Sequence, residues 1–436
     1  MGVIATAFAN LGQLLDTTAN LLYRGIAQGV ERPLDQKLLE RVSVADFGAK
    51  GDNITDDTAA INAAVAWCNS QTFPRELYFP PGQYRMTAAM TPISKPLVLA
   101  GDGPRCAILV FSGGGYDCIT FAGVTSRVAN GGVRGMGFYC SDMTGGTFLT
   151  VDWAQDMVFR DILVAGAYNF AYVRQAGNTT FDCIDAQPIR GAYGLKWYGT
   201  GATRNGEQDK SDVLEMKSTI LGGNLVPNER AGTVDLIWLD GFVQTFNFHR
   251  LQLFNSKHAI YTSNTPGLAY PHIPSFVIGS DLEIENSTED GIHAEVLNTM
   301  NVSGLFCAGS VMKSGIYLGP YASMISLTGG RSNTHALHGV HIDGACNVTL
   351  TGMALFNNSH QTHGVASGVR VVAGTMVALV GCTAGAPAGA GTFDNHQAYG
   401  IDNVGGLRVS AVATDFNGNV VAGKNGALES AACFGL

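Results

Sequence analysis

The chain has 436 residues, of which 46% are hydrophobic and only 14% are charged. It can therefore bury a large core, and its apolar content excludes a disordered protein. The net charge of −9 and the lack of any Lys/Arg run exclude nucleic acid as an expected partner. The chain has no apolar stretch of about 18 residues, so we expect no membrane insertion. The first residues also lack the basic start of a secretory signal.

Residues 1–41 predict a helical segment. Leu11, Leu14, Leu15, Leu21 and Leu22 recur at roughly helical spacing. The segment is too short for a core of its own. We therefore expect it to pack on a neighbour, a symmetry mate or a larger assembly.

Residues 42–100 predict turns, one helix and a strand. Gly48, Gly51 and Asp52 favour turns. Thr55 is the expected N-cap of the helix, and two aspartates in the first turn suit the helix dipole. We interpret these aspartates as capping residues and not as a catalytic pair. One face of the helix is apolar: Ala60, Ile61, Ala64, Val65 and Cys68.

This region carries a recognisable set of motifs: Asp46-Phe47-Gly48-Ala49, Gly51-Asp52, Thr55-Asp56-Asp57-Thr58 and Phe79-Pro80-Pro81-Gly82-Gln83-Tyr84. It resembles the N-terminal signature of the pectate-lyase-like, single-stranded right-handed parallel β-helix superfamily, in the version found in bacteriophage tailspike depolymerases. The resemblance implies an all-β solenoid whose open end is capped by the helix. It also implies a homotrimer with a substrate groove on its surface or between subunits.

Residues 101–415 are repetitive, with an apolar anchor at intervals mostly in the twenties and low thirties: Ile119, Phe148, Phe170, Leu195, Ile237, Ile260, Ile292, Ile316, Val340, Val369 and Ile401. Such periods with β-branched strands predict a β-solenoid of about ten or eleven coils. Asparagines near one turn of successive coils predict a structural ladder: Asn255, Asn286, Asn333 and Asn357. We expect an insertion at about 199–232, a loop at 262–274 and a C-terminal tail at 416–436.

Residues 276–287 predict a strand with Leu282 and Ile284 turned inward and three acids, Asp281, Glu283 and Glu285, turned outward. The acids form either a solvated outer face or an acid/base site. Aligning neighbouring coils on their turns at Gly223, Phe254, Glu285 and Gly309 puts Arg250 beside Asp281 and Gln252 beside Glu283, with Lys217 and Glu215 one rung further.

The residue after each anchor predicts a second outward column: Trp238, Tyr261, His293, Tyr317, His341 and Arg370. Exposed rings can stack on sugars, but aromatic ladders also stabilise stacked strands. Asp240 and Glu295 follow two residues later as reserve acid/base candidates. Five histidines, His335, His338, His341, His360 and His363, lack a fixed ligand spacing. We interpret them as solvated turns and expect neither a metal nor a cofactor.

The resemblance implies a phage tailspike-type depolymerase that hydrolyses a bacterial capsular, exo- or O-antigen polysaccharide in the virion tail, with tail or baseplate proteins binding its N-terminus. Asp281, Glu283 and Glu285 would be acid and base, while Arg250 and the ring column would bind sugar. Polygalacturonase motifs are absent. Two alternatives stay open. One is a polysaccharide lyase using His293, Tyr261 or Arg250, and the other is a non-enzymatic glycan-binding spike.

Overall fold

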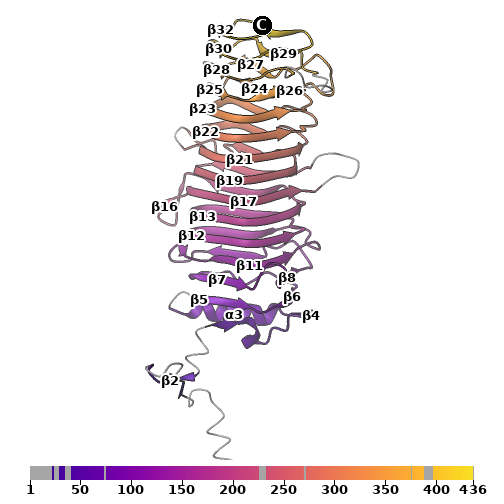
Figure 1. The fold of residues 1–436 in the computed structure, drawn as a ribbon. Helices are drawn as coiled ribbons and strands as arrows, with labels where there is room; N and C mark the ends of the chain where they lie inside the picture. Colours follow the sequence, from indigo (N-terminus) through magenta and orange to yellow (C-terminus); the bar gives the residue numbers. More distant parts are fainter. Residues whose placement is uncertain are drawn as a thin grey trace, which may run out of the picture.

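The computed structural model describes residues 22–23, 29–34, 41–72, 75–224, 232–269, 272–374, 376–386 and 396–435. Nearly all of its strands belong to one elongated stack, with the helix α3 (Thr58–Ser70) at one end (Figure 1). The strands pair in parallel with the equivalent strands of the coils before and after them. The molecule is therefore all-β with few helices, and its parallel strands stack around a closed circuit as in a parallel β-helix.

The strands of the stack, in chain order, are β3 (Val42–Ser43), β4 (Asp52–Asp56), β5 (Arg75–Phe79), β6 (Gly82–Met86), β7 (Leu97–Gly101), β8 (Ala107–Phe111), β9 (Ile119–Ala122), β10 (Val128–Ala129), β11 (Gly132–Tyr139), β12 (Thr147–Ala165), β13 (Asn169–Ile189), β14 (Tyr193–Gly199), β17 (Ser211–Gly223), β18 (Asp235–Gly241), β19 (Val243–Ser256), β20 (Ile260–Ser263), β21 (Ser275–Ser287), β22 (Ile292–Ala308), β23 (Ile316–Asn333), β24 (Val340–Asp343), β25 (Cys346–Thr351), β26 (Ala354–Phe356), β27 (Val369–Ala373), β28 (Val377–Val380), β29 (Tyr399–Asn403), β30 (Val409–Val412), β31 (Ala422–Asn425) and β32 (Glu429–Ala431).

Each central coil has three straight stretches, which we call its first, second and third faces in chain order. In β12 the faces are separated by Asp156 and Asp161, whose φ angles of 54° and 53° bend the chain without ending the pairing. Left-handed φ angles recur at the second of these corners in later coils: Ser218, Arg250, Asp281, Gly304 and Gly329. Aspartate tolerates this conformation better than most residues and glycine adopts it freely.

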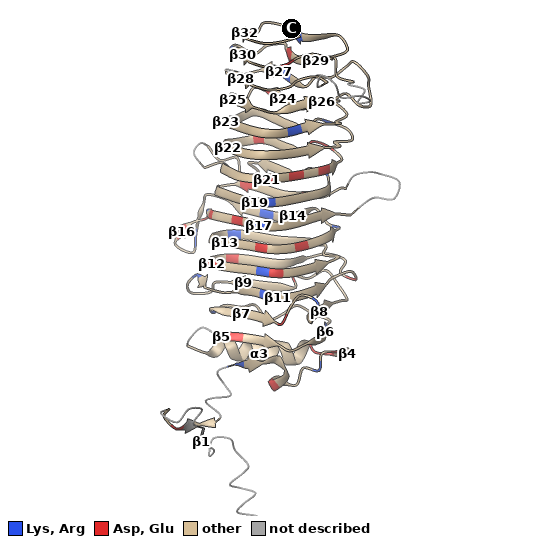
Figure 2. Ribbon diagram, in the orientation of Figure 1, with Lys and Arg blue, Asp and Glu red and all other residues tan. Residues whose placement is uncertain are grey.

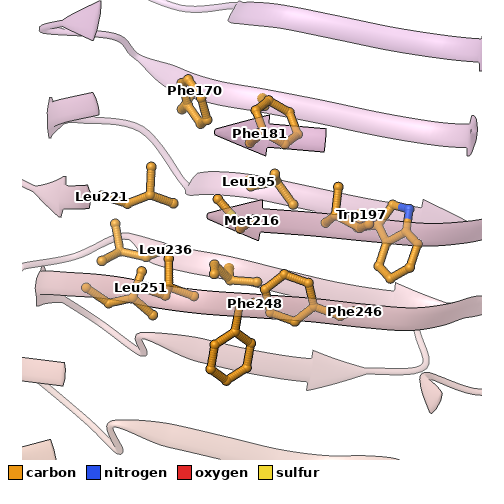
Figure 3. Packing of buried hydrophobic residues seen from close by; sticks show 14 of the residues in the cluster. Phe170, Phe181, Leu195, Trp197, Met216, Leu221, Leu236, Phe246, Phe248 and Leu251 are labelled. Atoms are coloured by element: carbon orange, nitrogen blue, oxygen red, sulfur yellow. The ribbon is translucent and has the colours of Figure 1, made fainter. Parts of the chain in front are cut away.

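The core runs along the inside of the stack. Figure 3 shows Phe170, Phe181, Trp197 and Phe248 among the side chains that fill it. Equivalent residues of neighbouring coils stack on one another, as do Phe159 and Phe181 with ring centroids 5.1 Å apart. Each such side chain contributes roughly 1.5–3 kcal/mol by leaving water, and no coil can achieve this burial alone.

Most predicted anchors pair with one another as expected, for example Ile237, Ile260 and Ile292. Two predicted anchors were wrong by one residue. Leu149 and Ala171 pair with the column, and the neighbouring Phe148 and Phe170 do not occupy it. Both phenylalanines are nevertheless buried, so hydrophobicity alone did not distinguish them from the anchors.

The N-terminal cap confirms the predicted helix face, with Ile61, Ala64, Val65 and Cys68 buried. The predicted N-cap was wrong, because Thr55 lies in β4 and the helix begins only at Thr58. Asp57 precedes the helix, but its carboxylate accepts the amides of Lys50 at 2.7 Å and Gly51 at 3.0 Å. Through these two hydrogen bonds the signature motif fixes the loop at Lys50 and Gly51 to the start of the helix.

The predicted helix at 1–41 lies mostly outside the described residues. Within the described part, β1 (Leu22–Tyr23) pairs with β2 (Arg32–Pro33) in an antiparallel ribbon, so Leu22 is not helical. No helix in the described ranges is long and apolar enough to cross a membrane.

Three further expectations need correction. The expected insertion at 199–232 is interrupted by β17, which is a regular strand of the stack. The expected tail adds another coil, because β31 and β32 pair with β29 and β30 and Phe434 bridges to Asp415. In the asparagine ladder, Asn255, Asn286 and Asn357 have positive φ, whereas Asn333 precedes the corner residue Thr334.

Candidate functional site

An open groove of about 700 Å³ lies on the third face, across β17, β19, β21, β22 and β23. Figure 2 shows acidic segments on β21 between basic segments on β19 and β23. The groove is lined by Ser218, Ile220, Arg250, Gln252, Asp281, Leu282, Glu283, Glu285, Gly304, Phe306 and Arg331. The structure therefore brings the three predicted acids together with the predicted arginine.

The predicted alignment of the central rungs is confirmed. Gln252 pairs with Glu283 in the β19–β21 ladder, and its amide donates to Glu283 Oε2 at 2.6 Å. Because Leu251 pairs with Leu282, the preceding residues Arg250 and Asp281 occupy the same corner of adjacent coils. Leu282 and Ile284 are buried between the acids, as the alternation predicted.

The outer rungs of that alignment were wrong by one residue. Phe254 pairs with Gly222 and not Gly223, and Glu285 pairs with Ala308 and not Gly309. Lys217 lies beside His249, before the Ser218 corner, and its Nζ contacts Glu215 Oε1 at 2.9 Å. This pair lies on the second face and does not line the groove.

Asp281 is a corner residue with φ of 56°, so the three acids do not project from one straight stretch. Its side chain is 58% exposed, and His249 Nδ1 lies 3.3 Å from Asp281 Oδ2. Within the described residues Arg250 makes no ion pair, although it lies beside Asp281 as the alignment predicted. Its guanidinium instead lines the groove, where an anionic or hydroxyl-rich ligand would meet it.

Two residues of the groove were not predicted from the sequence. Phe306 pairs with Glu283, and Arg331 pairs with Phe306 on the next coil. The Arg331 guanidinium lies over the Phe306 ring, 4.1 Å from its centroid. A cation held on a ring is a favourable arrangement, and it presents both groups to the groove. The turn alignment set Gly309 opposite Glu285, one residue too far, so it pointed to Cys307 and not to Phe306 as the neighbour of Glu283.

The predicted ring column is confirmed on the first face, where Trp238, Tyr261, His293 and Tyr317 occupy one ladder position. Neighbouring ring centroids lie 5.7, 5.5 and 4.6 Å apart along the column. Lys196 Nζ lies 3.5 Å from the centroid of Trp238. None of these residues lines the third-face groove, so the rings and the three acids belong to different faces.

The two reserve acids differ in environment. Asp240 is fully buried, where it accepts Ser263 Oγ and the Thr265 amide, both at 2.8 Å, and lies 3.3 Å from Lys196 Nζ. These contacts attach the expected 262–274 loop to the first face. Glu295 is 40% exposed, and its Oε2 lies 3.8 Å from His293 Nε2. Of the two, only Glu295 is open to a ligand.

Burial also shifts the pKa values of tyrosines on the first face and of histidines in the turns that precede it. It raises the pKa of Tyr317 to about 12, with help from nearby Glu295 and Asp343, and burial raises the pKa of Tyr261. The solvated-turn interpretation was wrong for His335 and His338, which are buried. Burial lowers the pKa of each to about 3, so both are neutral at pH 7.

A buried polar ladder was also missed. It lies two residues before the first-face anchors and comprises Asp235, His258, Asp290, Ser314, His338 and Ser367. Polar residues at one fixed offset from an apolar anchor were the signal available in the sequence. Their partners include one another, as in the 2.7 Å contact between His258 Nδ1 and Asp235 Oδ1.

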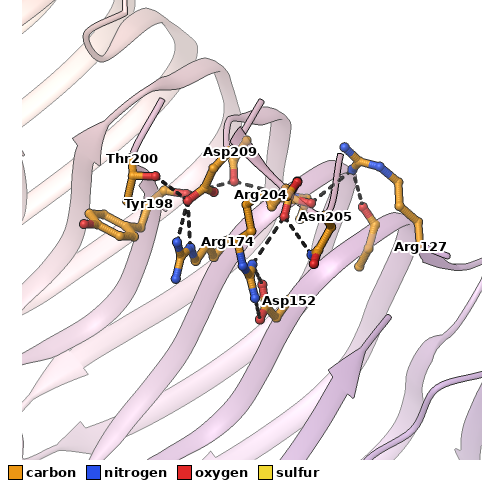
Figure 4. Close-up of polar contacts among 12 residues, drawn as sticks. Arg127, Asp152, Arg174, Tyr198, Thr200, Arg204, Asn205 and Asp209 are labelled. Atoms are coloured by element: carbon orange, nitrogen blue, oxygen red, sulfur yellow. Dashed lines mark hydrogen bonds and ion pairs between the residues drawn. The ribbon is translucent and has the colours of Figure 1, made fainter. Parts of the chain in front are cut away.

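A second polar cluster holds the hairpin of β15 (Thr203–Arg204) and β16 (Glu207–Gln208) against the first face (Figure 4). Asp209 is buried and accepts Arg174 Nη2 at 2.5 Å and Thr200 Oγ1 at 2.6 Å. The Arg204 guanidinium bonds to both carboxylate oxygens of Asp152. This network positions the projecting hairpin and leaves its buried charges paired.

The fold is similar to solved structures of low sequence identity. Bacteriophage CBA120 tailspike protein 3 aligns with a TM-score of 0.62 and 14% identity, over 98% of this chain and 68% of that chain. The A-module of Azotobacter vinelandii mannuronan C-5 epimerase AlgE4 aligns with a TM-score of 0.60 and 16% identity, over 89% and 99% of the two chains.

Sequence matches to known proteins are short. The tail spike protein of an Escherichia phage is 58% identical over 41 residues, which cover 9% of this chain and 5% of that protein. The non-secreted LysM effector LysM15 of Penicillium expansum is 41% identical over 78 residues, or 14% of this chain and 6% of that protein. The chain thus spans a small part of these relatives.

A family model covers much more of the chain. The model described as "Rhamnogalacturonase A/epimerase, pectate lyase-like" matches residues 41–293. That range begins just before the signature motif, includes Trp238, Tyr261 and His293 of the ring column, and ends after the acids of β21. Because the match extends over more than half of the chain, the protein belongs to the pectate lyase-like family of rhamnogalacturonase A and epimerases.

Proposed function

We propose that this protein is a tailspike-type depolymerase that cleaves glycosidic bonds of a bacterial surface polysaccharide by acid/base hydrolysis in the third-face groove. The observation that carries the proposal is the composition of that groove. Three carboxylates, two guanidiniums and an aromatic ring line one open groove with a volume of about 700 Å³. Carboxyl pairs perform glycoside hydrolysis, while arginine and aromatic side chains suit sugar binding.

Glu283 and Glu285 are the best-placed pair for the chemistry. They lie two residues apart on the straight stretch after the Asp281 corner, with the buried Ile284 between them. Such positions are roughly 6.7 Å apart on a strand, which favours inversion through a water between the two carboxyl groups. The Gln252 amide holds one oxygen of Glu283. Asp281, at the corner, would assist or bind substrate.

Arg250, Phe306 and Arg331 would hold the substrate. The two arginines line the same groove as the acids, and the Phe306 ring lies between Glu283 and Arg331 in the ladder. Trp238, Tyr261, His293 and Tyr317 would bind sugar only as a separate surface of the first face. The buried Asp240 would take no part in catalysis, and Glu295 would be the acid to examine if cleavage occurred on the first face.

The substitution Glu283→Gln tests the proposal. Loss of one acid/base group should lower the cleavage rate by about 10²–10⁴-fold, measured as new reducing ends on a panel of purified capsular and O-antigen polysaccharides. Glu215→Gln is the matched control, because Glu215 lies on the second face in an ion pair with Lys217. Full activity of Glu283→Gln with an unchanged oligomeric state would remove Glu283 from the mechanism.

A lyase remains the second candidate, and the two arginines of the groove favour it. A guanidinium suits the carboxylate of a uronic acid, and Arg250 makes no ion pair in the part of the chain that the structure describes. Elimination would create an unsaturated uronate that absorbs ultraviolet light, and hydrolysis would not. Glycan binding without any new reducing end would instead indicate a non-enzymatic spike.

The setting proposed for this activity is the tail of a phage virion, with the chain as a homotrimer and its N-terminal segment bound to tail or baseplate proteins. The fold similarity to tailspike protein 3 of phage CBA120 and the short identity to the tail spike protein of an Escherichia phage support this setting. Light scattering of the purified protein would test the trimer directly.

A further inference from the structure

The turn that connects the third face to the first face brings together side chains suited to a metal ion. His258 precedes β20, Asp290 precedes β22 and His293 lies within β22. One ligand atom from each of these residues lies within 4.8 Å of the other two. The cluster is separate from the groove, which none of the three residues lines, and it does not depend on the proposed function.

His258 is oriented as a metal-binding histidine would be. Its side chain is only 4% exposed, and Asp235 Oδ1 lies 2.7 Å from its Nδ1. A carboxylate can only accept here, so Nδ1 carries the proton and the lone pair of neutral His258 is on Nε2. Carboxylates commonly hold metal-binding histidines in this way.

The Nε2 atom of His258 has no hydrogen-bond partner within the described residues, although it is buried. Glu289 Oε2 lies 3.4 Å from this nitrogen. Like the nitrogen, the carboxylate oxygen is an electron-pair donor. Two such atoms face each other favourably only if a cation lies between them or if Nε2 takes up a proton. An unsatisfied buried polar atom of this kind destabilises the folded chain.

The other two residues are also held in place. Asp290 is buried, and its Oδ1 accepts the Ser314 amide at 2.9 Å, which leaves Oδ2 for another partner. Oδ2 lies 2.9 Å from His293 Nδ1. A metal ion would replace the proton that this contact now shares, because metals and protons compete for the same lone pairs.

The charge of the surroundings also suits a cation. Asp235, Glu289, Asp290 and Glu295 all contact one of the two histidines. Among the described residues, the lysine that contacts these carboxylates is Lys313, whose Nζ lies 2.8 Å from Glu289 Oε2. With neutral histidines the cluster is therefore strongly negative, and a divalent ion would compensate this charge in a mostly buried position.

We propose that His258, Asp290 and His293 bind a divalent transition-metal ion of the zinc class, with Asp235 as the residue that orients His258. Two imidazoles and a carboxylate are a typical donor set for zinc, whereas calcium prefers oxygen ligands alone. The ion would join two successive coils of the ladder at one turn. It would also fix the imidazole of His293, which belongs to the ring column.

The test uses the 436-residue chain without a histidine tag. The protein is stripped with a chelator and then dialysed against zinc alone, with calcium as a separate arm. Metal analysis should find a single zinc ion per chain, and calorimetry should show a higher melting temperature with zinc. His293→Gln should weaken zinc binding at least about 100-fold, and Asp235→Asn by about 10–100-fold. His249→Gln, which removes an exposed histidine beside Asp281, should leave zinc binding unchanged.

His293 is partly exposed, so its variant should fold even if substitution of the buried His258 does not. The absence of stoichiometric zinc on the wild-type protein would overturn the proposal. Equal zinc affinity of His293→Gln and His249→Gln would overturn it as well. Calcium binding as tight as zinc binding would contradict the assigned ligand chemistry.

Discussion

At the scale of single residues, burial separates the structural from the ligand-accessible polar side chains of this protein better than residue type does. Asp57, Asp209 and Asp240 are buried and paired with amides or cations. Asp281 and Glu283 are open to solvent or to a groove. In the sequence these aspartates and glutamates look alike, because charge pattern alone does not reveal which loop covers a side chain.

Asp57 illustrates the structural class. Its buried carboxylate accepts two backbone amides at the entrance to the fold. Asp57→Ala should lower the free energy of unfolding by about 3 kcal/mol, because both amides lose a charged acceptor. Denaturant unfolding would measure the loss. Asp52→Ala is the matched control, since Asp52 also accepts two amides but is exposed, and a loss as large as that of Asp57→Ala would contradict the role of burial.

At the scale of elements, the corners and loops decide what each strand presents. The corner at Asp281 separates it from the straight stretch that carries Glu283 and Glu285. The β15–β16 hairpin and the 262–274 loop each attach to the first face through a buried aspartate, Asp209 and Asp240 respectively. Such attachments are long-range, so the sequence indicated the loops but not what holds them.

The hairpin attachment can be tested with Asp209→Asn. The amide keeps the shape but loses the charge that pairs with Arg174, so the hairpin should open more often. A local loss of about 1.5 kcal/mol would raise the trypsin cleavage rate in this hairpin about tenfold. Asp212→Asn is the control, because Asp212 forms only an exposed pair with Lys210. Equal protection of Asp209→Asn and wild type would show that Asp209 is not needed to hold the hairpin.

At the scale of the whole molecule, stacked coils share buried ladders, and two of the buried histidines make stability depend on pH. His335 and His338 have pKa values lowered by burial from 6.5 to about 3. Above pH 6.5 both are neutral in the folded and unfolded states. As the pH falls from 6.5 towards 3, the unfolded chain binds protons that the folded chain excludes, so stability is progressively lost.

The melting temperature should therefore fall between pH 7 and pH 5. At pH 5 each buried histidine should reduce stability by about 2 kcal/mol relative to pH 7. His338→Asn should flatten this dependence, because asparagine can still accept the Ser367 amide that His338 Nδ1 accepts at 2.9 Å. His249→Asn, at an exposed position, should retain the wild-type slope. Calorimetry at several pH values would measure these slopes. A wild-type slope in His338→Asn would contradict this assignment.

Much of the architecture was determined by the sequence itself. Strand alternation, apolar anchors and the alignment of Arg250 with Asp281 follow from local hydrophobic patterns, because each coil must bury its anchor in the shared core. The right-handed winding stays a prediction. Unequal intervals between coils caused one-residue errors at Phe148, Phe170, Gly223 and Gly309. Such slips matter because neighbouring residues on a strand point to opposite faces.

Only the tertiary structure decided which side chains share a surface. It placed the ring column and the three acids on different faces, buried Asp240 under a loop, and added Phe306 and Arg331 to the groove. It also gathered His258, Asp290 and His293 at one turn. These groups come from coils whose spacing differs from one to the next, and their final positions depend on corners with positive φ and on loop packing. Loop packing in particular has no local signature, so the sequence predicted the stack and the neighbourhood of Arg250 and the three acids, but not the other side chains that share their surface.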